Sequence, residues 1–253
     1  MLHFDALPKD TGELLQRLHD LEEVDGFTLI GGTALALQVG HRRSEDLDLA
    51  WTQGNLPQGQ IETILKRLSA GTPPKLITDQ AALLAAENDG VDLNQSHQDW
   101  QVGNVKLTFY APFSAAQLAV YHDADAIDLG RLKVLDPEGV FKLKSSLLFE
   151  RKTSRDLYDL WFFLKHGNKT VDNILDAMDD RKQHYSTDSL LDRIAPPAFG
   201  LADPGFEPLL ADAPADKDSL LAAMRQVADE YRADLAYQLA IAQHHGSSKS
   251  PTR

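Results

Sequence analysis

Cysteine is absent from all 253 residues, which excludes disulfide bonds and metal sites built from thiolates. Long apolar runs are also missing, because no segment reaches the ~18 consecutive apolar residues that a membrane-spanning helix needs. The opening segment, MLHFDALPKDTGELL, lacks a basic region followed by an apolar core and is therefore not a signal peptide. From these absences we expect a cytoplasmic protein with no membrane partner.

Basic residues are scarce relative to acidic ones. The chain has 25 Lys and Arg against 38 Asp and Glu, which gives a formal net charge of −13. This balance argues against a generally basic nucleic-acid-binding surface. A small basic patch remains compatible with it, because net charge is an average over the whole surface. Hydrophobic residues make up 43% of the chain, which is enough for a sizeable core and argues against disorder.

The pattern of apolar residues predicts a mixed α/β (α+β) fold. A sheet flanked by helices is expected over residues 1–136, an all-helical region over 137–246 and a flexible tail over 247–253. The predicted strands are 27–30, 46–51, 76–79, two within 91–110 that turn at Gly103–Asn104, and 131–136. The predicted helices are one capped by Thr11, 33–39 ended by Gly40, 61–70, one after Pro137 that breaks near 152–154 with Ser154 as a new cap, and two more stretches separated by a proline-rich linker.

The segment GGTALALQVGHRRSEDLDL, residues 31–49, carries the first candidate site. A strand that ends at Gly31–Gly32 and opens a helix at Thr33 exposes backbone N–H groups that attract phosphate oxygens. The alternative is a plain strand-to-helix turn in which Thr33 is only the N-cap. The segment matches neither a P-loop nor a dinucleotide-binding fingerprint.

Two aspartates follow in the same segment. Because side chains alternate along a strand, Asp46 and Asp48 project on one side while Leu47 and Leu49 point into the core. Two such carboxylates can share a Mg²⁺ ion, which proteins hold through one or two carboxylates plus substrate phosphates. The alternative is a pair of solvated aspartates in an acidic protein. The intervening His41, Arg42 and Arg43 either contact phosphate groups or form a charged loop, and Ser44 can bond the turn backbone.

A second cluster lies in KSSLLFERKTSRDLYDL, residues 144–160. If the helix were continuous, Lys144, Leu148, Arg151, Arg155 and Asp159 would share one face. One Lys and two Arg on a single stripe suit a polyphosphate. The alternative is a set of surface ion pairs, Lys152 with Asp156 and Arg155 with Asp159, each contributing about 0.3–0.5 kcal/mol.

Together the two segments resemble the motifs of the AbiEii/AbiGii-type nucleotidyltransferases, toxins of type IV toxin–antitoxin and phage-defence systems. The first motif is Gly-Gly-Ser/Thr followed by Asp-x-Asp, and the later one is Lys, then Arg, then Arg-Asp-x-x-Asp. The resemblance spans residues 27 to 165 and implies a DNA polymerase β-like core. It implies transfer of a nucleoside monophosphate from an NTP to an acceptor, with RNA or tRNA favoured, and a possible cognate antitoxin as partner.

The resemblance also assigns roles to individual residues. It implies that Asp46 and Asp48 bind one or two Mg²⁺ ions and that Lys144 and Asp156 complete the catalytic set. The implied nucleotide-binding residues are Gly31, Gly32, Thr33, Arg43, Ser44, Arg155 and Asp159.

One position departs from the pattern of this superfamily. The strand VKLTFY is expected to carry a third carboxylate, but the corresponding position holds Thr108. Asp92 or Asp99 on the preceding strand, or Asp156, are candidate substitutes. The departure leaves open a nucleotide-binding protein without transferase activity. The net charge of −13 favours a third hypothesis, a transferase that modifies a small molecule or a protein.

Overall fold

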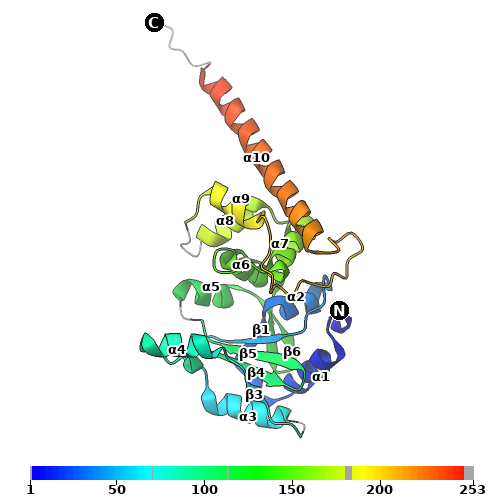
Figure 1. The fold of residues 1–253 in the computed structure, drawn as a ribbon, viewed down its shortest axis with the longest axis vertical. Coiled ribbons are helices and arrows are strands. Elements are labelled where there is room, and N and C mark those ends of the chain that lie inside the picture. Colours follow the sequence, from blue (N-terminus) through cyan, green and yellow to red (C-terminus); the bar gives the residue numbers. More distant parts are fainter. Residues whose placement is uncertain (1, 70, 113, 180–183, 248–253) are drawn as a thin grey trace.

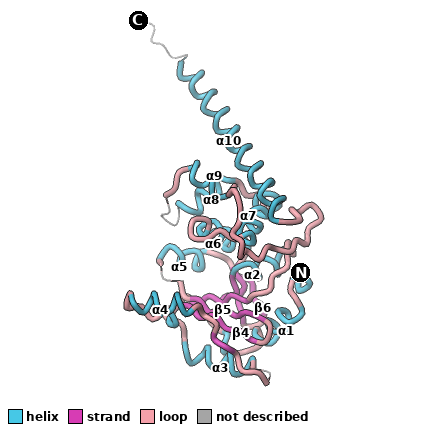
Figure 2. The backbone as a smooth tube through the Cα atoms, in the orientation of Figure 1, coloured by secondary structure: helices cyan, strands magenta, loops and turns pink. Residues whose placement is uncertain are grey.

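The computed structural model describes residues 2–69, 71–112, 114–179 and 184–247. A sheet with its helices forms one end of the molecule, a helical region packs above it, and the last helix extends outward (Figure 1, Figure 2). The strands are β1 (Phe27–Ile30), β2 (Leu47–Trp51), β3 (Lys75–Leu76), β4 (His97–Val102), β5 (Val105–Tyr110), β6 (Ala126–Leu129) and β7 (Leu132–Leu135). The expected mixed α/β fold class is confirmed.

In the described part of the chain these strands form one sheet in the order β3-β4-β5-β2-β1-β7-β6. Its centre is mixed, because β2 runs antiparallel to β1 but parallel to β5. Leu47 and Leu49 on β2 are fully buried, as the alternation of acidic and apolar residues predicted. The predicted hairpin is also confirmed, since β4 and β5 pair antiparallel around Gly103, whose φ is 59°.

The helices of the first part are η1 (Phe4–Ala6), α1 (Lys9–Leu18), η2 (Glu22–Val24), α2 (Gly31–Val39), α3 (Gln58–Leu68), α4 (Gln80–Asn88), η3 (Leu93–Gln95) and α5 (Ala115–Asp123). Helix α2 ends at Gly40 in the left-handed region, as predicted. The prediction that Thr11 caps α1 was wrong. This helix begins three residues earlier than predicted, at Lys9 after Pro8, and the Thr11 hydroxyl donates instead to the Glu45 carbonyl at 2.8 Å.

The second part contains α6 (Pro137–Leu147), α7 (Ser154–His166), α8 (Val171–Asp179), α9 (Thr187–Ile194) and α10 (Lys217–Ser247). Helix α6 begins with Pro137 behind an Asp136 cap, whose carboxylate accepts from the Gly139 amide. The predicted break before residue 154 is present, but its cap is Thr153, one residue before the predicted Ser154. The sequence analysis did not predict α9.

Helix α10 packs against the body only through its first turns, where Leu220, Leu221, Met224 and Ala228 are buried. Every side chain from 232 to 240 is exposed, and this part of the helix points away from the rest of the chain (Figure 1). None of the helices in the described residues is long and apolar enough to cross a bilayer. The tail predicted at 247–253 lies, from residue 248 on, outside the described residues.

Candidate active site

The two glycines at the end of β1 form the first turn of α2, not a separate loop before it. Gly31 has a φ of 72°, and a Cβ built there would lie 2.7 Å from Oδ2 of Asp48. A Cβ on Gly32 would overlap the guanidinium group of Arg42. Both positions therefore need glycine, because Asp48 from β2 and Arg42 from the loop after α2 approach the helix N-terminus closely. That end of a helix favours negative charge.

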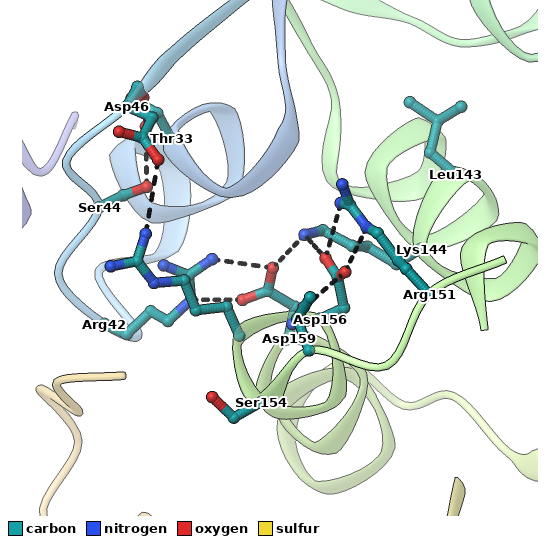
Figure 3. Close-up of polar contacts among 12 residues, drawn as sticks. Thr33, Arg42, Ser44, Asp46, Leu143, Lys144, Arg151, Ser154, Asp156 and Asp159 are labelled. Atoms are coloured by element: carbon teal, nitrogen blue, oxygen red, sulfur yellow. Dashed lines mark hydrogen bonds and ion pairs between the residues drawn. The ribbon is translucent and has the colours of Figure 1, made fainter. Parts of the chain in front are cut away.

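The hydroxyl groups of Thr33 and Ser44 are buried beside this turn. The Thr33 hydroxyl donates to the carbonyl oxygen of Asp46 and lies 2.8 Å from the Ser44 hydroxyl (Figure 3). These contacts hold the segment that leads into β2 against α2. They fix the position of Asp46, and the predicted contacts of Thr33 and Ser44 with a nucleotide stay predictions.

Asp46 and Asp48 line the same cavity, whose volume is about 250 Å³. Burial, and after it the neighbouring Asp48 carboxylate, raises the pKa of Asp46, which indicates two acids held close together. No hydrogen bond or ion pair from another described residue reaches the Asp48 carboxylate. This arrangement fits a hard divalent cation such as Mg²⁺. Because no third His, Asp or Glu joins them among the described residues, phosphate oxygens or water would complete the coordination.

Five basic side chains line this cavity: Arg42, Lys106, Lys144, Arg151 and Arg155. Arg155 lies 2.9 Å from Glu45 and 3.5 Å from Asp46, so it reaches the acid pair from α7. Arg43 is not brought into this group. Its guanidinium contacts Glu207 at 3.2 Å and the carbonyl oxygen of Asp5 at 3.0 Å. The cavity therefore gathers five basic side chains around the acid pair, although Asp156 lines it as well.

Asp159 is fully buried and connects the sheet to the helical region. Its carboxylate accepts from Arg42 at 2.6 and 3.0 Å, and it lies 2.7 Å from Lys144 and 2.8 Å from His41 (Figure 3). Burial opposes ionisation, but Arg42 and Lys144 outweigh it and hold the pKa of Asp159 well below its usual range. The pKa of His41 is lowered, chiefly by burial, so the ring is neutral near pH 7.

Asp156 forms the second half of this cluster. It pairs with Lys144, accepts from Arg151 at 2.7 Å and accepts from the Thr153 hydroxyl at 2.7 Å. Burial raises its pKa, but Lys144 and Arg151 lower it further, to about 2. The alternative of surface pairs, Lys152 with Asp156 and Arg155 with Asp159, was therefore wrong, because both carboxylates are buried and bind other cations. Lys144 lies between two carboxylates, and its contact with a triphosphate stays a prediction.

Thr108 occupies the middle of a row across three neighbouring strands. It stands opposite Asp48 on β2 and opposite Asp99 on β4, and its hydroxyl donates to Oδ1 of Asp99 at 2.8 Å. Asp99 thus lies one strand further from Asp48 than the expected third carboxylate. Asp92 was wrongly placed on the same strand. It precedes η3 and caps it through the Asn94 amide.

The sequence analysis missed two basic residues of the cavity, Arg42 as a site residue and Lys106 altogether. Lys106 had a usable signal, because it stands two residues before Thr108 and therefore faces the same side of β5. The sequence could not show whether Arg42 or Arg43 faces the cavity, because a loop has no regular period that fixes the direction of its side chains.

The model of one protein family matches most of the chain. It is the nucleotidyl transferase AbiEii toxin of type IV toxin–antitoxin systems, and the match covers residues 13–245. The chain belongs to this family. The resemblance drawn from the two motifs is therefore confirmed. The chain is a member of a family of nucleotidyltransferase toxins.

Two solved structures from Helicobacter pylori are similar to the AbiEii-family chain. JHP933 is 17% identical with a TM-score of 0.46, and the match covers 94% of this chain and 99% of that one. A proposed nucleotidyltransferase is 17% identical with a TM-score of 0.47, and the match covers 90% and 96%. No curated protein matches the chain significantly.

Proposed function

We propose that the chain transfers a nucleoside monophosphate from an NTP to a hydroxyl group of RNA, with tRNA favoured, in a Mg²⁺-dependent reaction. One observation carries this proposal: two adjacent carboxylates and five basic side chains line one cavity beside a helix N-terminus. Acids that bind a divalent cation and bases that bind polyphosphate are the two components that nucleotidyl transfer needs. Family membership supports the reaction type.

Each part of the cavity has a role in this proposal. Asp46 and Asp48 would hold the metal, which when bound neutralises phosphate charge and stabilises the developing negative charge on oxygen. Arg151 and Arg155 bind the triphosphate from the side opposite the sheet. Lys144 adds positive charge while Asp156 and Asp159 fix its position. The acceptor oxygen bonds to the α-phosphorus, and the bond to the β-phosphate oxygen breaks to release pyrophosphate.

We propose two parts, a nucleotidyltransferase core at 1–136 and a helical region at 137–246 that completes the active site. Lys144, Arg151, Arg155 and Asp156 all come from the second part. We assign RNA as acceptor because five basic side chains gather at this cavity in a chain of net charge −13. As a type IV toxin in phage defence, the chain would act with a cognate antitoxin.

The test is a labelling assay with purified full-length chain, Mg²⁺ and each of the four NTPs labelled at the α-phosphate. Separate reactions contain tRNA, other RNA, a protein mixture and small-molecule acceptors. We expect label on tRNA, and a loss of at least about 100-fold for Asp48→Asn, because a metal ligand stabilises the transition state by several kcal/mol. Asp128→Asn, on the exposed strand β6, is the control and retains activity.

The other acceptors distinguish the alternatives. Label on a protein or a small molecule instead of RNA would overturn the acceptor assignment but keep the reaction. Thr108 at the place of a third carboxylate favours a second candidate, a nucleotide-binding protein without turnover. That candidate predicts thermal stabilisation by NTP with no label on any acceptor and no pyrophosphate release.

A further inference from the structure

The acceptor hydroxyl must lose its proton during the transfer, so some side chain beside Asp48 has to accept it. This question arises only if the proposed function holds. Asp46 and Asp48 are committed to the metal. Asp156 and Asp159 are buried against Lys144, Arg42 and Arg151, and their lowered pKa values make them weak bases. The main acids of the first cavity are therefore unsuited to the task.

A second cavity of about 270 Å³ adjoins the first, since Asp48, Lys144 and Arg151 line both. Its sheet side is formed by Thr108 on β5 and His97 on β4. His97 and Asp99 face the same side of β4, because they are two residues apart on a strand. The imidazole thus borders the space beside Asp48, while β5 separates it from the acid pair.

Asp99 holds this imidazole in one orientation. Its Oδ2 lies 3.2 Å from Nε2 of His97 and 3.2 Å from Nζ of Lys106, and its Oδ1 accepts from Thr108 at 2.8 Å. Burial raises the pKa of Asp99, but the hydrogen bonds from His97 and Thr108 outweigh it, so the carboxylate stays ionised. An ionised acceptor at Nε2 keeps the proton on that nitrogen and leaves the lone pair on Nδ1. No described residue makes a hydrogen bond to Nδ1.

We infer that His97 is the general base of the reaction, with Asp99 as its positioning residue and Thr108 as the link that fixes Asp99. Nδ1 of His97 takes the proton from the acceptor hydroxyl as the oxygen–phosphorus bond forms. The bond from the α-phosphorus to the bridging oxygen breaks, and its electron pair leaves with pyrophosphate. The imidazolium then returns its proton to water. The His97–Asp99 pair thereby takes the place of the expected third carboxylate.

Other ionisable groups face the same cavity or lie beside the imidazole and form its electrostatic surroundings. They are Lys106, Tyr110, Tyr121, Lys144, Glu150 and Arg151. Glu150 is the competing base. It lies in the loop between α6 and α7, its side chain is exposed, and no described residue holds its carboxylate in place. His97 is preferred because a general base must be held in position, and the Asp99 carboxylate lies 3.2 Å from its ring.

The first experiment compares transfer rates across pH for the wild type, His97→Gln, Asp99→Asn and Glu150→Gln. We expect His97→Gln to lower kcat by about 100-fold or more, to leave NTP binding unchanged, and to lose the acid limb of the profile. Asp99→Asn lowers kcat less and shifts that limb. His184→Gln is the matched control, because His184 forms an exposed pair with Asp179 at 3.2 Å, the same length as the His97–Asp99 contact.

Imidazole added to a His97→Ala variant should restore part of the lost rate, which a purely structural role would not allow. A second readout does not require activity. Nitrogen NMR of the nucleotide-free chain should show His97 protonated at Nε2 with the lone pair on Nδ1, and Asp99→Asn should disturb that tautomer.

The outcomes separate the two proposals. Full activity of His97→Gln, loss of the acid limb in Glu150→Gln, or a proton on Nδ1 would overturn the role of His97 and leave the transferase function intact. A wild type without transfer to any acceptor would overturn the proposed function, and the base assignment with it.

Discussion

At the scale of single residues, the site depends on what two glycines make room for. Gly31 leaves space for the Asp48 carboxylate and Gly32 leaves space for the Arg42 guanidinium. An acidic and a basic side chain therefore lie together at the first turn of α2. A side chain at either position would displace a group of the site. The glycines therefore contribute by their small size, in addition to exposing backbone amides.

Replacing Gly31 with alanine should damage stability and activity together. The residue is in the left-handed region and the new Cβ would lie 2.7 Å from Asp48, so we expect a loss of about 1–3 kcal/mol in unfolding free energy. Transfer activity should fall at least tenfold because Asp48 moves. Gly12→Ala is the control, because that site in α1 has nothing within 4 Å and should gain roughly 1 kcal/mol. Urea denaturation measures the unfolding free energy of the two variants. Equal changes for Gly31→Ala and Gly12→Ala would contradict this prediction.

The sequence identified most residues of the site but few of their partners. Asp46 and Asp48 could be found because the strand period places them on one face. Lys144, Arg155, Asp156 and Asp159 were named because their order along the chain resembles the later motif of the family. The pairing of Asp159 with Arg42 could not, since these residues lie 117 positions apart and meet only through tertiary packing. His97 carried no signal without its neighbour across the sheet.

At the scale of elements, α6 and α7 are separate helices that an ion pair holds together. The break at 148–153 turns the chain so that Lys144 of α6 lies against Asp156 of α7. The sequence predicted the break from Ser154, because serine commonly caps helices. It missed the short edge strand β6 and the helices α4, α5 and α9, because each has too few residues to show a clear period.

The Asp156 contact should make stability depend on pH in a defined direction. A depressed pKa in the folded state stabilises the fold above the unfolded value of about 3.9, and this contribution disappears as pH falls towards about 2. Asp156→Asn should therefore be less stable than the wild type at pH 6, with roughly 2 kcal/mol of the difference vanishing as the solution is acidified. Urea denaturation from pH 6 to 2 checks this, with Asp128→Asn as control. A difference that is constant with pH would contradict it.

At the scale of the whole molecule, stability is concentrated in the body and not in the outer part of α10. Truncation after Arg232 should change unfolding free energy by no more than about 0.5 kcal/mol, because the removed side chains from 233 to 240 are exposed. Truncation after Asp216 also removes Leu220, Leu221, Met224 and Ala228, each of which is buried. Burial of each leucine-sized side chain contributes about 1.5–3 kcal/mol to the free energy of unfolding. The shorter chain loses this stabilisation and should unfold. Thermal denaturation of the two truncated chains distinguishes the two expectations.

The Arg42–Asp159 contact has a consequence for the chain during its synthesis. Asp46 and Asp48 leave the ribosome about a hundred residues before Asp159, and N-terminal parts of a chain fold first. Until α7 emerges, Arg42 has no carboxylate to bind and the cavity lacks Arg155. An unfinished polypeptide, or one cut short by premature termination, therefore carries the two acids of the candidate site without the side chains that α7 contributes. The candidate site is complete only when synthesis has passed α7.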